Sequence, residues 1–302
     1  MAKFIKFFTA LLLVFLLVNF LYLTLLPKID WDFGKTREAY RFKNKQLKVL
    51  VFGNSMAMDG VNTEMLSGVF GPAYNFSVGG ASLETNLIQL NEYLRNNAKP
   101  AKVLLMLGSA HTNYRNGNEV NPIIDYYYGD DFVVKNLKGI PLFKFRWLFI
   151  ENFKKLLSAN HRSAIVVNGQ LRINSIVPDI SSKKNKLDSC LQNDVYNAPG
   201  YSGMWSIIDV CKKAGITIEI FEMPCWKEVQ NNCTDINISR KTGDSVYNLQ
   251  INNLNNFNRC DTLLDPKKDW LSKNHLNYSG SSKVTREIIR MLANTISPVN
   301  PN

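Results

Sequence analysis

The sequence predicts an α/β fold with a parallel sheet, preceded by one transmembrane helix. Short apolar runs bounded by Gly and Pro alternate with longer segments of helical periodicity, a pattern typical of strands that helices cover on both faces. A long apolar run opens the chain. With 302 residues and 45% hydrophobic composition, the chain can bury a substantial core. We therefore expect a three-layer sandwich with helices on both faces of the sheet.

The alternation runs from the first predicted strand to the last predicted helix. The predicted strands are Leu47–Phe52, Pro72–Val78, Ala101–Leu107 and Gly215–Phe221. The predicted helices are Ser82–Asn96, Tyr201–Ala214 and Ser279–Ile296. In a parallel sheet, the residues that directly follow strands gather at one edge, where ligands bind. Ser55, Gly80 and His111 each follow a strand, so we expect them to share that edge.

Residues 1–27 form the predicted anchor. About 20 nearly uncharged residues follow Lys6, the length that crosses a bilayer as a helix. Residues 19–26 lack the small residues of a cleavage site, so we expect an uncleaved anchor. Positive charges flank the span on both sides and leave its orientation open. We place the large domain outside the cytoplasm because a lone N-terminal anchor usually serves an exported domain. Residues 28–46 are polar and predict a tether, and residues 47–302 form the main domain.

Composition narrows the classes of partner. The formal net charge of +11 is spread along the chain without a dense basic run. It favours anionic surroundings such as phospholipid headgroups or acidic glycans. Nucleic acid is not expected, because no recognised binding motif accompanies the charge. His111, His161 and His275 are isolated and no cysteine pair has zinc-ligand spacing, so we expect neither a metal nor another cofactor. Cys225 and Cys233 bracket a short loop that a disulfide could close, with buried thiols as the alternative.

Residues 112–199 break the alternation and are expected to form an insertion. They contain Asp125–Tyr128 and an aromatic stretch over 141–150, which is expected to continue as a helix to about residue 157. These aromatics fit a lid, a glycan-binding platform or a membrane-facing helix. The alternative is a helical pair whose rings pack into the core.

The pairing of Ser55 with His275 is the most informative feature of the chain. Ser55 sits on a tight turn directly after the first predicted strand, and His275 lies in the loop before the last predicted helix. A serine hydroxyl is a poor nucleophile near neutral pH, and an adjacent imidazole that takes its proton removes this obstacle. We therefore predict Ser55 as a nucleophile and His275 as its general base, if the fold brings them together.

These residues resemble motif blocks of the SGNH (GDSL-type) hydrolases. Gly53-Asn54-Ser55 stands where the family has Gly-Asp-Ser, and 75–82 resembles the second block. Within it, Gly80 matches the glycine whose amide helps to form the oxyanion hole. Residues 272–277 resemble the last block, Asp-x-x-His before a helix. The resemblance covers most of residues 46–296 in order and spacing. It implies a flavodoxin-like sandwich and an oxyanion hole built from Ser55 and Gly80.

The third block departs from the family pattern. Ala110 occupies the place of the oxyanion-hole asparagine, so one side-chain donor is lost. Removing such a donor typically costs about 10²–10³ in rate, unless Asn113 or Asn54 substitutes. Asn54 and His111 are also candidate substrate contacts, with a structural role as the alternative for His111.

The last block departs as well, because Ser272 replaces the triad acid. Either Asp269 orients His275 from a shifted position, or Ser55 and His275 act as a dyad. The α/β-hydrolase fold is the runner-up, since 53–57 approaches the G-x-S-x-G elbow. That elbow belongs after several strands, with its oxyanion loop upstream. Here the serine follows the first strand, which favours the SGNH resemblance.

The resemblance implies acyl-ester chemistry through a seryl intermediate. A membrane-anchored SGNH domain is similar to proteins that O-acylate cell-envelope polymers, among them the DltD-like and polysaccharide O-acetyltransferase groups. The implied partners are an acylated donor, an envelope glycan and a multispanning membrane acyltransferase. Hydrolysis of envelope glycan or lipid esters is the enzyme alternative. An inactive SGNH fold that binds glycan or scaffolds an export complex is a different class, which the lost asparagine and triad acid favour.

Overall fold

The computed structural model describes residues 1–108, 120–128, 145, 150, 164–175, 201–225, 236–242, 245–254, 264–265 and 267–294. The chain divides into two compact units. The first comprises Met1–Arg41 and Pro122–His161, and the second comprises Phe42–Asn121 and Arg162–Asn302.

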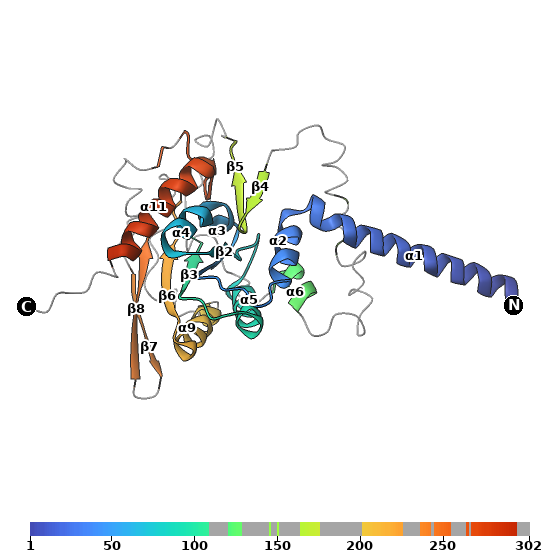
Figure 1. Cartoon of the computed structure of the whole chain (residues 1–302), viewed down its shortest axis with the longest axis horizontal. Coiled ribbons are helices and arrows are strands. Elements are labelled where there is room, and N and C mark those ends of the chain that lie inside the picture. The colour runs from blue at the N-terminus through green and yellow to red at the C-terminus, as the bar shows by residue number, and fades with distance from the viewer. Residues whose placement is uncertain are drawn as a thin grey trace, which may run out of the picture. The chain divides into compact units, whose positions relative to one another are not determined.

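A mostly parallel sheet forms the centre of the second unit (Figure 1). Within the described ranges it has six strands in the order β2-β1-β3-β6-β8-β7. Their bounds are β1 Val49–Gly53, β2 Ala73–Asn75, β3 Lys102–Leu107, β6 Thr217–Glu222, β7 Ile236–Thr242 and β8 Ser245–Asn253. Neighbouring strands from β2 to β8 run parallel, and β7 alone is antiparallel to its partner β8. The predicted α/β class is therefore confirmed, with one antiparallel edge strand added.

Helices alternate with these strands. They are α3 Ser55–Gly60, α4 Thr63–Phe70, α5 Leu83–Asn96, α9 Ser202–Ala214 and α11 Tyr278–Asn294. The Ser82 side chain caps α5 by accepting a hydrogen bond from the Thr85 N–H at 3.1 Å. Gly215 ends α9 in the left-handed conformation, with φ 63°. The predicted helices match α5, α9 and α11 closely, because cap residues and a long apolar periodicity mark them in the sequence.

Burial of β1 explains its continuous apolar sequence. Val49 and Val51 belong to a core cluster that side chains of α3, α4 and α11 complete. Leu50 and Phe52 point to the opposite face of the sheet and are also fully inaccessible to solvent. The Phe52 ring stacks on Phe76, with 5.2 Å between ring centroids. Both faces of the strand are therefore covered, as the apolar run predicts.

Three antiparallel strand pairs were not predicted. Two are β4 Ala164–Val167 with β5 Gln170–Ile173, and β9 Trp270–Ser272 with β10 His275–Leu276. The third pair is β7 with β8, whose strands carry many polar residues and lack a continuous apolar run. Asn168 and Gly169 turn the first hairpin with φ values of 47° and 76°. Asn-Gly between two apolar runs is a strong hairpin signal, so the sequence held this information.

The first unit contains a helix where a tether was expected. Its described helices are α1 Ala2–Ile29, α2 Trp31–Tyr40 and α6 Pro122–Tyr128. The Asp30 carboxylate caps α2 by accepting from the Phe33 N–H at 2.9 Å. The buried Phe33 ring lies 5.5 Å from Tyr126, 5.3 Å from Tyr127 and 5.2 Å from Phe145, between centroids. The rings of α6 therefore pack against α2 within this unit. The helix expected to run on to residue 157 lies outside the described residues apart from Phe145 and residue 150.

The α1 helix is long and apolar enough to cross a membrane. Its 28 residues give a length of about 42 Å at 1.5 Å per residue, more than the ~30 Å hydrocarbon core. Large apolar side chains such as Phe4, Phe7 and Leu13 are exposed along it, as a lipid-facing surface requires. The predicted apolar span is therefore confirmed by its helical length and composition.

Candidate active site

The C-terminal end of β1 presents Ser55 at the first turn of α3. Gly53 ends the strand where a Cβ would lie 2.6 Å from the Met106 carbonyl oxygen, so a larger residue would not fit. Asn54 then caps α3, since its side-chain oxygen accepts from the Met56 N–H at 3.0 Å. The cap is therefore supplied by Asn54, and the Ser55 hydroxyl is not needed for it. Asn54, which the sequence suggested as a substrate contact, thus has its side-chain oxygen occupied by the helix.

The fold brings His275 to Ser55, as predicted. The Nε2 atom of His275 lies 3.5 Å from the Ser55 Oγ. This is the outer limit of a hydrogen bond, a separation typical of catalytic pairs without substrate. His275 begins β10, whose short antiparallel pairing with β9 holds the residue in position.

Asp59, and not Asp269, is the carboxylate that meets His275. The Asp59 Oδ2 lies 2.8 Å from the His275 Nδ1. Asp59 stands four residues after Ser55 on α3, on the same face of the helix, and is only 4% exposed. A carboxylate that accepts the Nδ1–H leaves Nε2 unprotonated and facing the serine. Asp59 was not predicted from the sequence, because the acid was expected in the residues just before His275. Its i, i+4 spacing from Ser55 is visible in the sequence.

Asp59 also sets the charge state of His275. Burial lowers the pKa of the imidazole, but the hydrogen bond and the negative charge of Asp59 outweigh burial and raise the pKa above its ordinary value of 6.5. A protonated His275 imidazole is therefore stabilised by a fixed, buried charge.

Asp269 has a structural place instead. It is fully buried, and its two oxygens accept from the Ser279 hydroxyl and the Lys283 ammonium, both at 2.7 Å. The Asp265 N–H donates to it at 2.6 Å. Asn277 follows β10, and its side-chain oxygen accepts from the Gly280 N–H at 3.0 Å. These contacts tie the loop that carries His275 to the first turns of α11.

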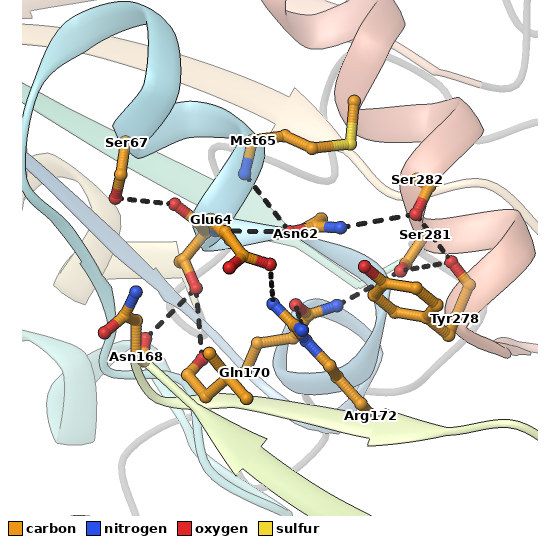
Figure 2. Close-up of polar contacts among 12 residues, drawn as sticks. Asn62, Glu64, Met65, Ser67, Asn168, Gln170, Arg172, Tyr278, Ser281 and Ser282 are labelled. Carbon is orange, nitrogen blue, oxygen red and sulfur yellow. Dashed lines mark hydrogen bonds and ion pairs between the residues drawn. The ribbon is translucent and has the colours of Figure 1, made fainter.

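A second polar network fixes the same turns to α4 (Figure 2). The side-chain oxygen of Asn62 caps α4 by accepting from the N–H groups of Glu64 at 3.1 Å and Met65 at 3.2 Å. Its amide nitrogen donates to the Ser282 Oγ at 3.3 Å. One side chain thus starts α4 and binds it to α11.

The β5 strand completes this network (Figure 2). Gln170 is fully buried and donates to the Ser281 Oγ at 3.1 Å. Arg172 forms an ion pair with Glu64 at 2.8 Å and lies over the Tyr278 ring, 4.9 Å from its centroid. Tyr278 comes three residues after His275, so these contacts hold β5 against the base of the histidine loop.

The same hairpin also packs on α3. Met58, between Ser55 and Asp59, forms an apolar cluster with Leu171 and Ile173 of β5 and with Leu271 of β9. The helix that carries both the serine and the acid is therefore covered by β5 and β9.

Of the other predicted site residues, the structure describes some and leaves others outside its described ranges. Gly80 lies on the turn after β2, is exposed and has φ 64°. Because β2 runs parallel to β1, this turn lies at the same edge of the sheet as Ser55. Asn113, His111 and Ala110 lie outside the described residues. Ser272, in the place of the family's acid, donates to the Asn274 side chain at 2.9 Å.

The described residues contain no cluster of three or more His, Cys, Asp or Glu that could hold a metal ion. Cys211 is a buried thiol, and burial raises its pKa to about 12. Cys225 is buried as well, but Cys233 lies outside the described residues, so their disulfide stays a prediction.

Comparisons with known proteins do not assign the chain to a family. No protein-family model matches it, and the search of curated proteins gives no match. Among solved structures, the chain is similar to "a putative platelet activating factor from Streptococcus pneumonia", with 13% identity and a TM-score of 0.39. That similarity covers 92% of this chain and 98% of the other.

Proposed function

We propose that the chain is a membrane-anchored serine enzyme that carries out acyl-ester chemistry. The observation that carries the proposal is the line of contacts from Ser55 through His275 to Asp59, with distances of 3.5 Å and 2.8 Å. Nucleophile, base and orienting acid are the parts that acyl transfer through serine requires. The SGNH-type three-layer sandwich is part of the same proposal, supported by the parallel sheet and by the serine directly after its first strand.

In the proposed reaction, the Ser55 oxygen attacks the carbonyl carbon of the acyl donor while His275 Nε2 takes the hydroxyl proton. Asp59 holds the Nδ1–H and balances the charge of the imidazolium. The imidazolium then gives its proton to the leaving alcohol, and an acyl-serine remains. In the second half, His275 removes a proton from the acceptor hydroxyl, whose oxygen attacks the acyl carbon. The bond from that carbon to the Ser55 oxygen breaks, and the imidazolium returns the proton to Ser55. The backbone amides of Ser55 and Gly80 are the proposed oxyanion donors.

The acceptor is the finer part of the proposal. A domain that α1 anchors outside the cytoplasm stands near a donor delivered through the membrane and near envelope polysaccharide, which favours O-acylation of that glycan. We therefore expect slow turnover of a simple chromogenic ester, and less ester on the envelope glycan when the gene is deleted. Rapid hydrolysis together with more envelope ester after deletion would identify an esterase instead.

The inactive-scaffold alternative loses one of its two supports. It was favoured by the missing triad acid and the missing oxyanion asparagine, and Asp59 now supplies a buried carboxylate at His275. A protein that only binds glycan has no need for this arrangement, so the enzyme is the better-supported class.

A fluorophosphonate probe tests the proposal directly, because only an activated serine reacts with it. The full chain in detergent should be labelled at Ser55, and Ser55→Ala should abolish labelling without changing the melting temperature. Ser206→Ala is a matched control, since among the described residues this hydroxyl donates within α9, to the Ser202 carbonyl. No labelling of the folded wild-type chain, or undiminished labelling of Ser55→Ala, would refute the proposal.

A further inference from the structure

A basic surface lies at the N-terminal ends of the parallel strands, whereas Ser55 lies at their C-terminal ends. Three segments form this lysine edge: 42–48, 96–102 and 211–217. They precede or begin β1, β3 and β6, which are neighbours in the sheet and run parallel. The N-terminal ends of these strands therefore lie side by side.

Backbone hydrogen bonds join the three segments. Ala98 N–H donates to the Lys45 carbonyl at 2.9 Å, which links the first segment to the second. Thr217 N–H donates to the Ala101 carbonyl at 3.3 Å, which links the second to the third. The lysine edge is thus one continuous surface built from parts that are far apart in the sequence.

Its charge is of one sign. The segments hold three, two and two lysines respectively and no Asp or Glu. The exposed members are Lys43, Lys45, Lys48, Lys99, Lys212 and Lys213. The fold therefore brings six exposed lysines from three separate parts of the sequence to one edge.

The lysine edge and the candidate active site are at opposite ends of one strand. Lys48 immediately precedes β1, and Ser55 follows it by two residues. Five strand residues span about 17 Å at ~3.4 Å each. A surface that binds through the lysines would thus direct Ser55 away from that surface.

The short connection between α1 and the lysine edge points to the bilayer as the partner of these lysines. Only α2 and a few residues separate the end of α1 at Ile29 from Lys43. Their reach is roughly 30 Å, at ~1.5 Å per helical residue and ~3.4 Å per extended residue. We propose that the lysine edge binds the anionic headgroups of the bilayer that α1 spans, and so turns Ser55 toward the aqueous side. The proposal rests on α1 as a membrane anchor, and it holds whether or not Ser55 is catalytic.

Amine labelling of the full chain in lipid nanodiscs tests this surface. An amine-acylating reagent and mass spectrometry give a rate for each lysine, in discs of phosphatidylcholine with or without phosphatidylglycerol. With phosphatidylglycerol, labelling of Lys45, Lys99 and Lys213 should slow by roughly threefold or more, and high salt should restore it. Lys267 is exposed on the loop that leads to His275, and its rate should not change.

A charge-reversed chain provides the second arm. Lys45→Glu, Lys99→Glu and Lys213→Glu together should remove the protection of the remaining edge lysines, with the melting temperature confirming the fold. Equal rates in both kinds of disc would overturn the proposal. Protection by soluble polygalacturonate in neutral discs, but not by anionic lipid, would also overturn it and indicate an acidic glycan. Fluorophosphonate labelling of Ser55 in the same samples reports the proposed catalysis separately.

Discussion

At the scale of single residues, Asp59 supplies the carboxylate that orients His275, although the position three residues before the histidine holds Ser272. Ser55 and Asp59 share one short helix, so the proposed nucleophile and the proposed acid are fixed relative to each other by helix geometry alone. Only His275 has to be brought in by tertiary structure, and the 2.8 Å contact with Asp59 fixes its ring. The two buried carboxylates therefore have different roles: Asp59 orients the His275 ring, and Asp269 holds the loop that carries His275.

Asp59→Asn is expected to lower the rate of fluorophosphonate labelling by about 10³–10⁴-fold, because the amide favours the wrong histidine tautomer. Asp269→Asn is the matched change at a buried carboxylate that does not touch His275. It should retain most of the labelling rate while lowering the unfolding free energy by about 1–3 kcal/mol, since its contact with Lys283 weakens. Labelling rates and denaturant midpoints of the two variants check this. The reverse pattern would restore Asp269 as the acid.

The pH dependence should report the raised pKa of His275. Only the neutral imidazole accepts the serine proton, so labelling should rise with pH through a midpoint above 6.5. In Asp59→Asn, burial still lowers the pKa and its raising partner is gone, so the midpoint should move to lower pH. The stabilising contribution of the raised pKa is complete below 6.5 and is lost as pH rises through the folded-state value. A midpoint that does not move in the variant would contradict this.

At the scale of elements, the β4–β5 hairpin supports the site without belonging to the sheet. Its tip docks on the core, because the Asn168 carbonyl accepts from the Asn75 N–H at 3.0 Å and from the Thr63 hydroxyl at 3.1 Å. Its β5 side carries Gln170 into the contacts with α11. The hairpin therefore links the helix of Ser55 and the loop of His275.

Gly169→Ala tests the hairpin. Gly169 has φ 76°, and a methyl group there would collide with the Asn75 carbonyl oxygen. The substitution should cost about 2–4 kcal/mol of stability and slow the labelling of Ser55. Gly68→Ala is the control, because this exposed glycine lies inside α4 with nothing within 4 Å of an added Cβ. It should stabilise the chain by about 0.5–1 kcal/mol. Equal denaturation midpoints for the two variants would show that the tip does not secure the hairpin.

At the scale of the whole molecule, the two ends of the parallel strands have different proposed roles. The C-terminal edge presents Ser55, and the N-terminal edge presents the lysines. With α1 as an anchor, this polarity places the proposed chemistry where soluble polymers can reach it. The proposed orientation therefore agrees with a polymeric acceptor, and a donor delivered through the membrane has to reach about 17 Å beyond the lysine edge to Ser55.

Topology can be measured with reporters fused after Asn302. We expect an alkaline phosphatase fusion to be active and a green fluorescent protein fusion to be dark, because the main domain is proposed to lie outside the cytoplasm. The paired reporters control for expression, since each is active where the other is not. A fluorescent, phosphatase-negative chain would place the domain in the cytoplasm and remove envelope glycan as the acceptor.

The sequence alone determined the α/β class, the apolar span and the pairing of Ser55 with His275. Local patterns carry this information: strands buried on both faces read as apolar runs, and Ser82 and Gly215 mark helix ends. Only the tertiary structure decided the rest. The sequence does not distinguish Asp59 from Asp269 as the partner of His275, because both are carboxylates. Packing places Asp59 against the imidazole and Asp269 against Ser279. The tertiary structure also gathered the lysines, because hydrogen bonds between parallel strands bring distant segments to one edge.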